Sequence, residues 1–333
     1  MRSLMNSRAR SITARTWWLL AGLLAFSMVA GICVGAQGLT VSEVWSAIAD
    51  SRDSVTSAIV VDIRIPRVLC AAVVGASLAI AGVVLQATYA NALVDAGLVG
   101  ISSSAGIAAA LASVFISADS RLLLALSAAV AASLLAISLS RIRLSGLAFV
   151  LLGVAVGSAA TAVLGVLASM PTTAMGRSVA SWVFGSFAMA DWRSLTPLAL
   201  GLLGGTALLM RQGWGLDAAT LGTRQAQSLG VDIRRQRTRW SVAAALLVAP
   251  AVAGFGVIGF VGLVVPHIAR LMGARTASRQ IVASALIGSL LTVVADTAVR
   301  VAFHGIEVPV GFLLAFIGAP VLIRNLMGRA HAL

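Results

Sequence analysis

The chain has 333 residues, of which 59% are hydrophobic and only 11% are charged, and its formal net charge is +13. Soluble domains carry about 25% charged residues, so this composition excludes an ordinary water-soluble protein. The length allows roughly ten bilayer crossings of about 20 residues each. Because backbone polar groups in lipid must be satisfied within the protein, long unbroken apolar runs predict helices and not barrel strands.

Apolar runs separated by short polar stretches predict an all-α polytopic membrane protein. We expect about ten transmembrane helices in one domain, residues 17–327, between a cytoplasmic N-terminal segment, 1–16, and a cytoplasmic tail, 328–333. The first run is longer than a usual signal-peptide core, so we expect it to be retained. The ten segments, of which the eighth is too short to span alone, are 17–36, 67–88, 98–117, 121–140, 147–168, 193–210, 238–254, 256–265, 279–302 and 309–327.

The distribution of charge predicts the orientation. Every one of the 24 basic residues is arginine. If the N-terminus is cytoplasmic and the segments alternate, most arginines fall on the inner side, as the positive-inside rule prefers. Both termini are then cytoplasmic, residues 37–66 and 169–192 lie outside, and residues 211–237 form a polar inner loop with a short helix.

The sequence lacks the motifs of nucleotide binding, metal binding and hydrolytic catalysis. There is no P-loop, so we expect no nucleotide binding by this chain itself. There is no zinc-protease motif and no Cys/His cluster with metal spacing, so we predict no metal, no cofactor and no catalytic residues. Cys33 and Cys70 lie in or beside apolar stretches and indicate packing, not a disulfide framework.

One acid stands inside a long apolar segment. Asp296 is followed four residues later by Arg300, so both lie on one helix face. They form either a mutually neutralising pair near the outer end of a helix or a functional charge at an outer mouth. A proton-coupled transporter would place buried acids on several helices, which argues against secondary transport.

Motifs in both halves of the chain resemble one family. Residues 64–67 are RIPR, residues 75–86 are GASLAIAGVVLQ, and Asn91 and Leu93 follow. Residues 254–273 are GFGVIGFVGLVVPHIARLMG, and 221–231 are LGTRQAQSLGV. The last motif comprises Asp296, Arg300, Glu307, Pro309, Gly311, Gly318 and Pro320.

In this order, over residues 60–327, the motifs are similar to those of the FecCD family of permeases, which serve siderophore, haem and cobalamin importers. Ala92 and Ala96 stand where that family usually has proline, so the local backbone is in question. The resemblance implies the type II ABC importer permease fold, with ten helices per subunit and two subunits around a central path. Whether the second subunit is a copy or a paralogue stays open.

The resemblance further implies a permease subunit in a bacterial cytoplasmic membrane that translocates an iron–siderophore, haem or cobalamin. Its partners would be a cytoplasmic ABC ATPase dimer and an extracytoplasmic binding protein, with no nucleic acid. The chain would not be an enzyme. The alternatives are an ion-gradient-driven secondary transporter and an intramembrane enzyme.

Three sites are expected. By the family resemblance, the segment 266–279 after the eighth apolar run couples to the ATPase through Pro266, His267, Arg270 and Gly273. The same resemblance implies a cytoplasmic gate at Asn91, Leu93 and Ser145, although Ser145 is equally well explained as a helix N-cap. The topology puts Arg64, Arg67 and Arg300 at external helix ends, where they could dock the binding protein; alternatively Arg300 only neutralises Asp296 and Arg67 only anchors a helix end.

Overall fold

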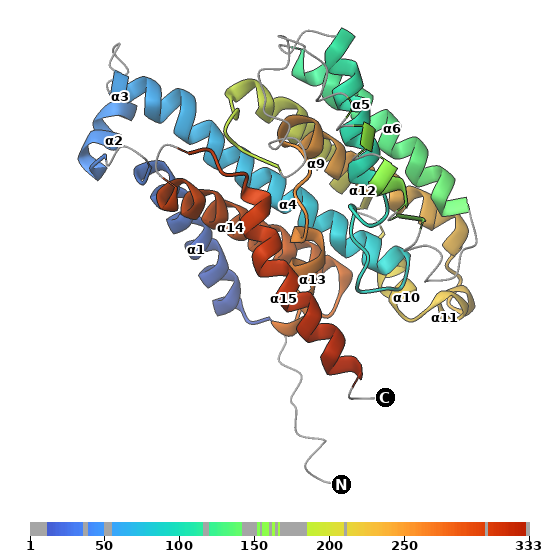
Figure 1. The fold of residues 1–333 in the computed structure, drawn as a ribbon. Helices are drawn as coiled ribbons and strands as arrows, with labels where there is room; N and C mark the ends of the chain where they lie inside the picture. The colour runs from blue at the N-terminus through green and yellow to red at the C-terminus, as the bar shows by residue number, and fades with distance from the viewer. Residues whose placement is uncertain are drawn as a thin grey trace.

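The computed structural model describes residues 12–35, 39–49, 55–115, 120–141, 185–209, 212–303 and 306–330, with isolated positions between 152 and 166. Throughout these residues the regular elements are helices (Figure 1). They are α1 (Ala14–Cys33), α2 (Val41–Ala49), α3 (Val55–Ala58), the π-helix η1 (Ile59–Arg64), α4 (Ile65–Thr88), α5 (Ile101–Phe115), α6 (Arg121–Arg141), α9 (Trp192–Leu209), α10 (Gly213–Thr220), α11 (Thr223–Ser228), α12 (Ile233–Phe255), α13 (Val261–Leu271), α14 (Ala277–Ala302) and α15 (Val310–Ala330).

Most predicted segments are confirmed as helices, with ends shifted by a few residues. The fifth segment, 147–168, lies largely outside the described residues. The polar segment 211–237, expected to form an inner loop with one short helix, holds two short helices, α10 and α11.

The prediction of the eighth segment at 256–265 is wrong. Residues 256–260 are not helical, and α13 begins at Val261 and continues to Leu271. Gly256, with φ +79°, ends α12, and Phe260, with φ +68°, precedes α13 in the left-handed region. Left-handed backbone is unfavourable for a residue with a side chain, so a phenylalanine is not expected to break a helix in this way. The hydrophobic periodicity of the sequence therefore could not locate the break. Pro266, His267 and Arg270 therefore lie within helix α13 and not in a segment that follows the apolar run.

Within the described residues, four helical stretches are long and apolar enough to cross a bilayer: Ala14–Cys33, Val55–Thr88, Arg235–Phe255 and Ala277–Ala302. A fifth is obtained if α9 and α10, bent by 73°, count as one span. Shorter apolar stretches lie in α5, α6, α13 and α15. The all-α polytopic class is thereby confirmed.

Helix α4 is the buried axis of the bundle, and α14, α12, α13 and α9 pack around it (Figure 1). Gly75 of α4 meets Gly288 of α14 so closely that a Cβ on Gly75 would lie 2.3 Å from the Gly288 carbonyl oxygen. Nearby, the Ser289 hydroxyl donates to the Ala72 carbonyl and the Thr292 hydroxyl to the Ala71 carbonyl, both at 2.7 Å. Small residues and interhelical hydrogen bonds of this kind hold helices together where lipid removes the hydrophobic driving force.

The two ends of the bundle differ. Figure 1 shows α2 and α3 at one end, beside the start of the long span through η1 and α4, and α10 and α11 at the other end. The expected topology makes the first end external and the second cytoplasmic.

Candidate functional site

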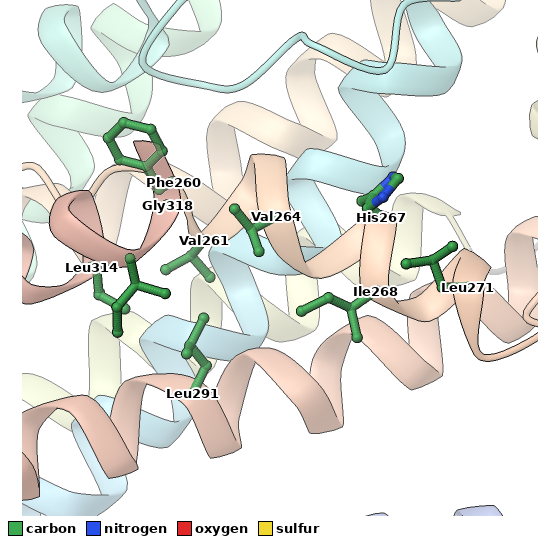
Figure 2. Close-up of a pocket in the computed structure, with 10 residues that line it drawn as sticks. Phe260, Val261, Val264, His267, Ile268, Leu271, Leu291, Leu314 and Gly318 are labelled. Atoms are coloured by element: carbon green, nitrogen blue, oxygen red, sulfur yellow. The ribbon is translucent and has the colours of Figure 1, made fainter. Parts of the chain in front are cut away.

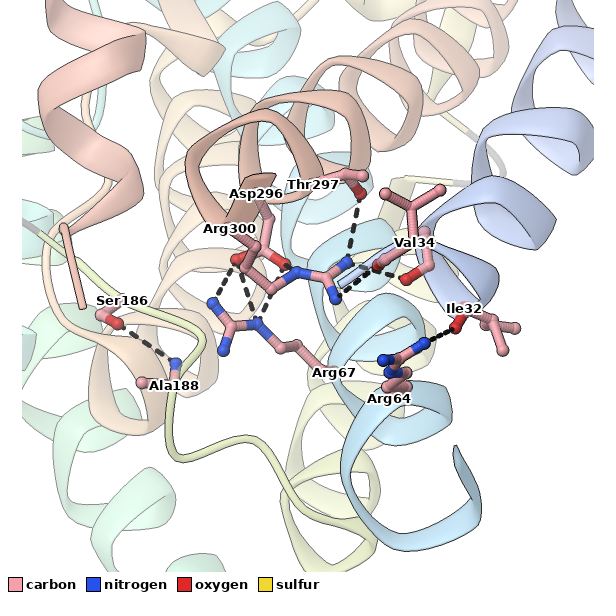
Figure 3. Close-up of polar contacts among 10 residues, drawn as sticks. Ile32, Val34, Arg64, Arg67, Ser186, Ala188, Asp296, Thr297 and Arg300 are labelled. Atoms are coloured by element: carbon pink, nitrogen blue, oxygen red, sulfur yellow. Dashed lines mark hydrogen bonds and ion pairs between the residues drawn. The ribbon is translucent and has the colours of Figure 1, made fainter. Parts of the chain in front are cut away.

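Two arginines from different helices share one buried carboxylate at the end of the bundle that holds α2 and α3 (Figure 3). Arg67 of α4 donates from Nε and Nη2 to both oxygens of Asp296, over 2.8–3.2 Å. Arg300 of α14 donates from Nε to Asp296 Oδ2 at 3.1 Å. The Asp296 side chain is only 3% exposed. Two cations on one anion leave the group with one excess positive charge.

The same cluster holds the end of α1. Arg300 Nη2 donates to the Gly31 carbonyl at 2.8 Å. Arg64 Nη1 donates to the carbonyls of Ile32 and Cys33 at 2.9 and 2.8 Å. The last carbonyls of a helix have no partner within it, and the partial negative charge there favours cations. Arg64, Arg67, Asp296 and Arg300 thus join α1, α4 and α14.

The structure therefore brings the three predicted docking arginines together, but not as free surface charges. Arg64 is 5% exposed and lies on the end of α1. The expected Asp296–Arg300 pair is confirmed. The pairing of Arg67 with the same carboxylate was missed, because 229 residues separate the partners and no local spacing indicates the contact.

Beside this cluster a cavity of about 280 Å³ is lined by both charged and apolar side chains. Arg67 and Arg300 are among its lining residues. The other lining residues are Ser186, Val299, Phe303, Ile306, Glu307 and Val308.

At the opposite end of α4, Gln86 fixes the start of α13. Its Nε2 donates to the Gly262 carbonyl at 3.1 Å, and its Oε1 accepts from Arg270 Nη1 at 2.8 Å. Gln86 is buried, at 5% exposure. Arg270, predicted to couple to an ATPase, is thus bonded to the central helix. The motif that ends at Gln86 includes this residue, but its partners in α13 could not be predicted from the motif.

The predicted gate segment follows directly after α4. The Asn91 side-chain oxygen accepts the N–H of Leu93 at 3.0 Å, which forms a local turn. The N–H of Ala96 donates to Asp95 Oδ1 at 2.5 Å. A proline at 96 would have no such donor, so the departure from the family motif is matched by a local hydrogen bond. Ser145 lies outside the described residues.

The predicted coupling segment lies against α10. Gly273 follows α13 with φ +97°, and Thr276 caps α14 by accepting the N–H of Arg279. The Ala277 N–H donates to Asp217 Oδ1 of α10 at 2.5 Å. The turn between α13 and α14 and the helix pair α10–α11 are therefore neighbours. Exposed arginines in these elements are Arg224, Arg275 and Arg279.

His267 lines an apolar groove. It lies at one end of this groove of about 290 Å³ between α13, α14 and α15, among side chains such as Ile268, Leu271 and Leu314 (Figure 2). Phe260 closes the other end against Gly318. The groove holds no charged side chain among its lining residues.

Within the described residues, the all-helical bundle with several apolar spans and buried interhelical charges defines a polytopic α-helical membrane protein. The FecCD transport family profile matches residues 23–328, and the chain belongs to this family of ABC importer permeases. The recognition made from the motifs is confirmed.

Individual relatives agree with this membership. The chain is 36% identical over 319 residues to the vitamin B12 import system permease protein of Vibrio cholerae, covering 94% of this chain and 95% of the relative. It is 33% identical over 309 residues to the hemin transport system permease protein of Yersinia pestis, covering 90% and 92%. A solved structure of an inward-facing metal-chelate type ABC transporter superposes with a TM-score of 0.78 at 28% identity, over 93% of this chain and 98% of that one.

Proposed function

We propose that the chain carries an iron–siderophore, haem or cobalamin inward across a bacterial cytoplasmic membrane, driven by a separate ABC ATPase. Membership of the FecCD family carries this proposal, because relatives with one-third identity over nearly the whole chain are named as vitamin B12 and hemin permeases. The proposal includes a second permease subunit, an extracytoplasmic binding protein and cytoplasmic termini.

The test is uptake in vesicles that contain the chain, its ATPase and its binding protein, with labelled cobalamin, hemin and a ferric siderophore offered separately. We expect one of them to accumulate, uptake to stop on ATP depletion, and uptake to continue when the proton gradient is collapsed. Uptake that needs the gradient and not ATP would support the secondary-transporter alternative. ATP hydrolysis by the isolated chain would contradict the proposal that a separate subunit hydrolyses ATP.

The arginine cluster is proposed as the docking charge for the binding protein. Its excess positive charge, at the external end of three helices, suits a surface carboxylate, and arginine pairs with carboxylate bidentately. Arg67 and Arg300 border the cavity, whereas buried Arg64 would contribute mainly by holding α1.

Arg67→Gln and Arg300→Gln, taken singly, are expected to slow association of the binding protein severalfold and to reduce its salt dependence. Each variant lowers the net charge of the cluster by one while Asp296 keeps one arginine partner, and charges of this kind act mainly on association rate. Stopped-flow binding at low and high salt is the measurement. Arg235→Gln, an exposed arginine at the other end of the bundle, is the matched control. Equal association rates in all variants would show that the cluster does not take part in docking the binding protein.

The turn at 273–276, with α13 before it and α10 beside it, is proposed to transmit ATPase motion to α13 and α14. Gly273→Val is expected to uncouple ATP hydrolysis from uptake while the chain still inserts, because valine at φ +97° must distort the turn. Left-handed backbone costs a residue with a side chain about 1–2 kcal/mol. Gly230→Val is the matched control, because it also places valine in left-handed backbone, at φ +82°, with open space around its Cβ. If both variants lose coupling equally, strain alone explains the effect.

Asn91, Leu93 and Ser145 are proposed to line the cytoplasmic gate. Cysteines introduced at these positions are expected to cross-link to the second subunit in one nucleotide state and not in another. Cross-linking yields with and without a non-hydrolysable ATP analogue measure this. Yields independent of nucleotide would place these residues outside the gate.

A further inference from the structure

The short helix α2 has three distinct faces. Val44 and Ala47 are buried against Val60 of η1, with Ile32 and Cys33 of α1 beside them. Val41, Trp45 and Ile48, spaced at i, i+4 and i+7 on a second face, are 70%, 72% and 47% exposed. The third face carries the exposed polar residues Ser42, Glu43 and Ser46, with the small side chain of Ala49 beside Ser42.

At 100° per residue, the buried face and the exposed apolar face are adjacent, and the polar face lies opposite the exposed apolar one. A helix in water needs one apolar face for its protein contact and would be polar elsewhere. A second, exposed apolar face therefore requires another apolar surface beside the protein.

The position of α2 supplies that surface. Its protein contacts, Ile32 and Cys33, are the last residues of the membrane span α1, and Val60 and Ile65 lie at the start of the long span through α4. The helix thus packs where two spans leave the bilayer (Figure 1). The exposed face of α1 itself is apolar up to this level, with Phe26 73% and Val29 58% exposed.

The polar face is built to stay in water. Thr40 and Glu43 form a capping box, in which the Thr40 N–H donates to Glu43 Oε2 at 2.7 Å and the Glu43 N–H donates to Thr40 Oγ1 at 3.3 Å. The hydrogen bonds that Glu43 accepts from the Thr40 N–H and the Thr40 hydroxyl lower the pKa of its carboxyl group. Ser57 of α3 donates to the Ala47 carbonyl at 3.0 Å and fixes the roll of the helix about its own axis.

We propose that α2 lies flat in the headgroup region of the bilayer, with Val41, Trp45 and Ile48 inserted into lipid and Ser42, Glu43 and Ser46 in water. Tryptophan favours this interface because its ring is apolar and its N–H is polar. The occupant of the exposed apolar face is lipid, and the helix fixes the height and tilt of η1, which carries Arg64. The proposal needs only that the chain spans a membrane and is independent of the cargo.

Spin labels at single cysteines test it on the full-length chain in phospholipid nanodiscs, with Cys33 and Cys70 replaced by alanine. Trp45→Cys and Ile48→Cys probe the apolar face, and Ser42→Cys and Ser46→Cys probe the polar face of the same helix. Phe26→Cys on α1 provides the lipid reference, and Ser228→Cys on α11 provides the water reference. Size-exclusion profiles verify that each labelled variant is folded.

Labels at 45 and 48 are expected to collide with oxygen, which concentrates in lipid, severalfold more than with a water-soluble nickel chelate. Labels at 42 and 46 should show the reverse preference and resemble the water reference. Nickel access at all four positions would overturn the proposal by placing α2 in water. Protection of 45 and 48 from both reagents would also overturn it, because a protein surface would then cover the face.

Discussion

Gly75→Leu is expected to abolish the accumulation of folded protein, because α4 and α14 could no longer approach each other. A Cβ at Gly75 would lie 2.1 Å from Thr292 Oγ1 and 2.3 Å from the Gly288 carbonyl oxygen. The backbone atom cannot rotate away, and moving Thr292 would break its hydrogen bond to the Ala71 carbonyl. Overpacking a core ordinarily costs about 1–3 kcal/mol, and here the added side chain meets backbone on a largely buried helix.

The measurement is the yield of monodisperse protein after detergent extraction, followed by thermal unfolding of whatever is recovered. Gly22→Leu is the matched control, since it lies in the span α1 and a Cβ there would meet nothing within 4 Å. We expect the control to match the unmodified chain. Equal yield and equal melting of Gly75→Leu would mean that the α4–α14 crossing is not the central contact of the fold.

The sequence could predict the number and kind of elements because lipid leaves few alternatives. A long apolar run such as the one in α14 must be a helix, since its backbone cannot bond to the solvent. It could not predict where α13 begins, because the break depends on Phe260 adopting φ +68° with its ring against Gly318 of α15. That contact joins residues that only the tertiary fold brings together.

The cluster of Arg64, Arg67, Asp296 and Arg300 was likewise predictable only in part. Asp296 and Arg300 share one helix, so their spacing alone predicts the contact. Arg67 reaches Asp296, and Arg64 reaches Cys33, only after α1, α4 and α14 have packed. Their location at helix ends was predictable from topology, but their burial and their partners were not. The same holds for Gln86 and Arg270, which are 184 residues apart.

Asp296→Asn is expected to destabilise the protein strongly, by about 3–5 kcal/mol, the usual result of removing one member of a buried ion pair. The change leaves Arg67 and Arg300, whose side chains are 15% and 13% exposed, facing each other without a counter-charge. It keeps the shape of the side chain, so lost packing contributes little. The midpoint of thermal unfolding in detergent is the measurement, because it requires no knowledge of the cargo.

Arg67→Gln separates charge balance from the loss of hydrogen bonds. It also removes contacts to Asp296, but it leaves the Asp296–Arg300 pair neutral, so its effect should be clearly smaller than that of Asp296→Asn. Asp232→Asn, an exposed N-cap at which asparagine caps equally well, should leave the midpoint unchanged. Added salt should raise the midpoint of Asp296→Asn more than that of Arg67→Gln, since only the former leaves Arg67 and Arg300 in repulsion without their counter-charge. If the two variants were equally unstable at all salt concentrations, Asp296 would act as a hydrogen-bond acceptor and not as the counter-charge that joins α4 to α14.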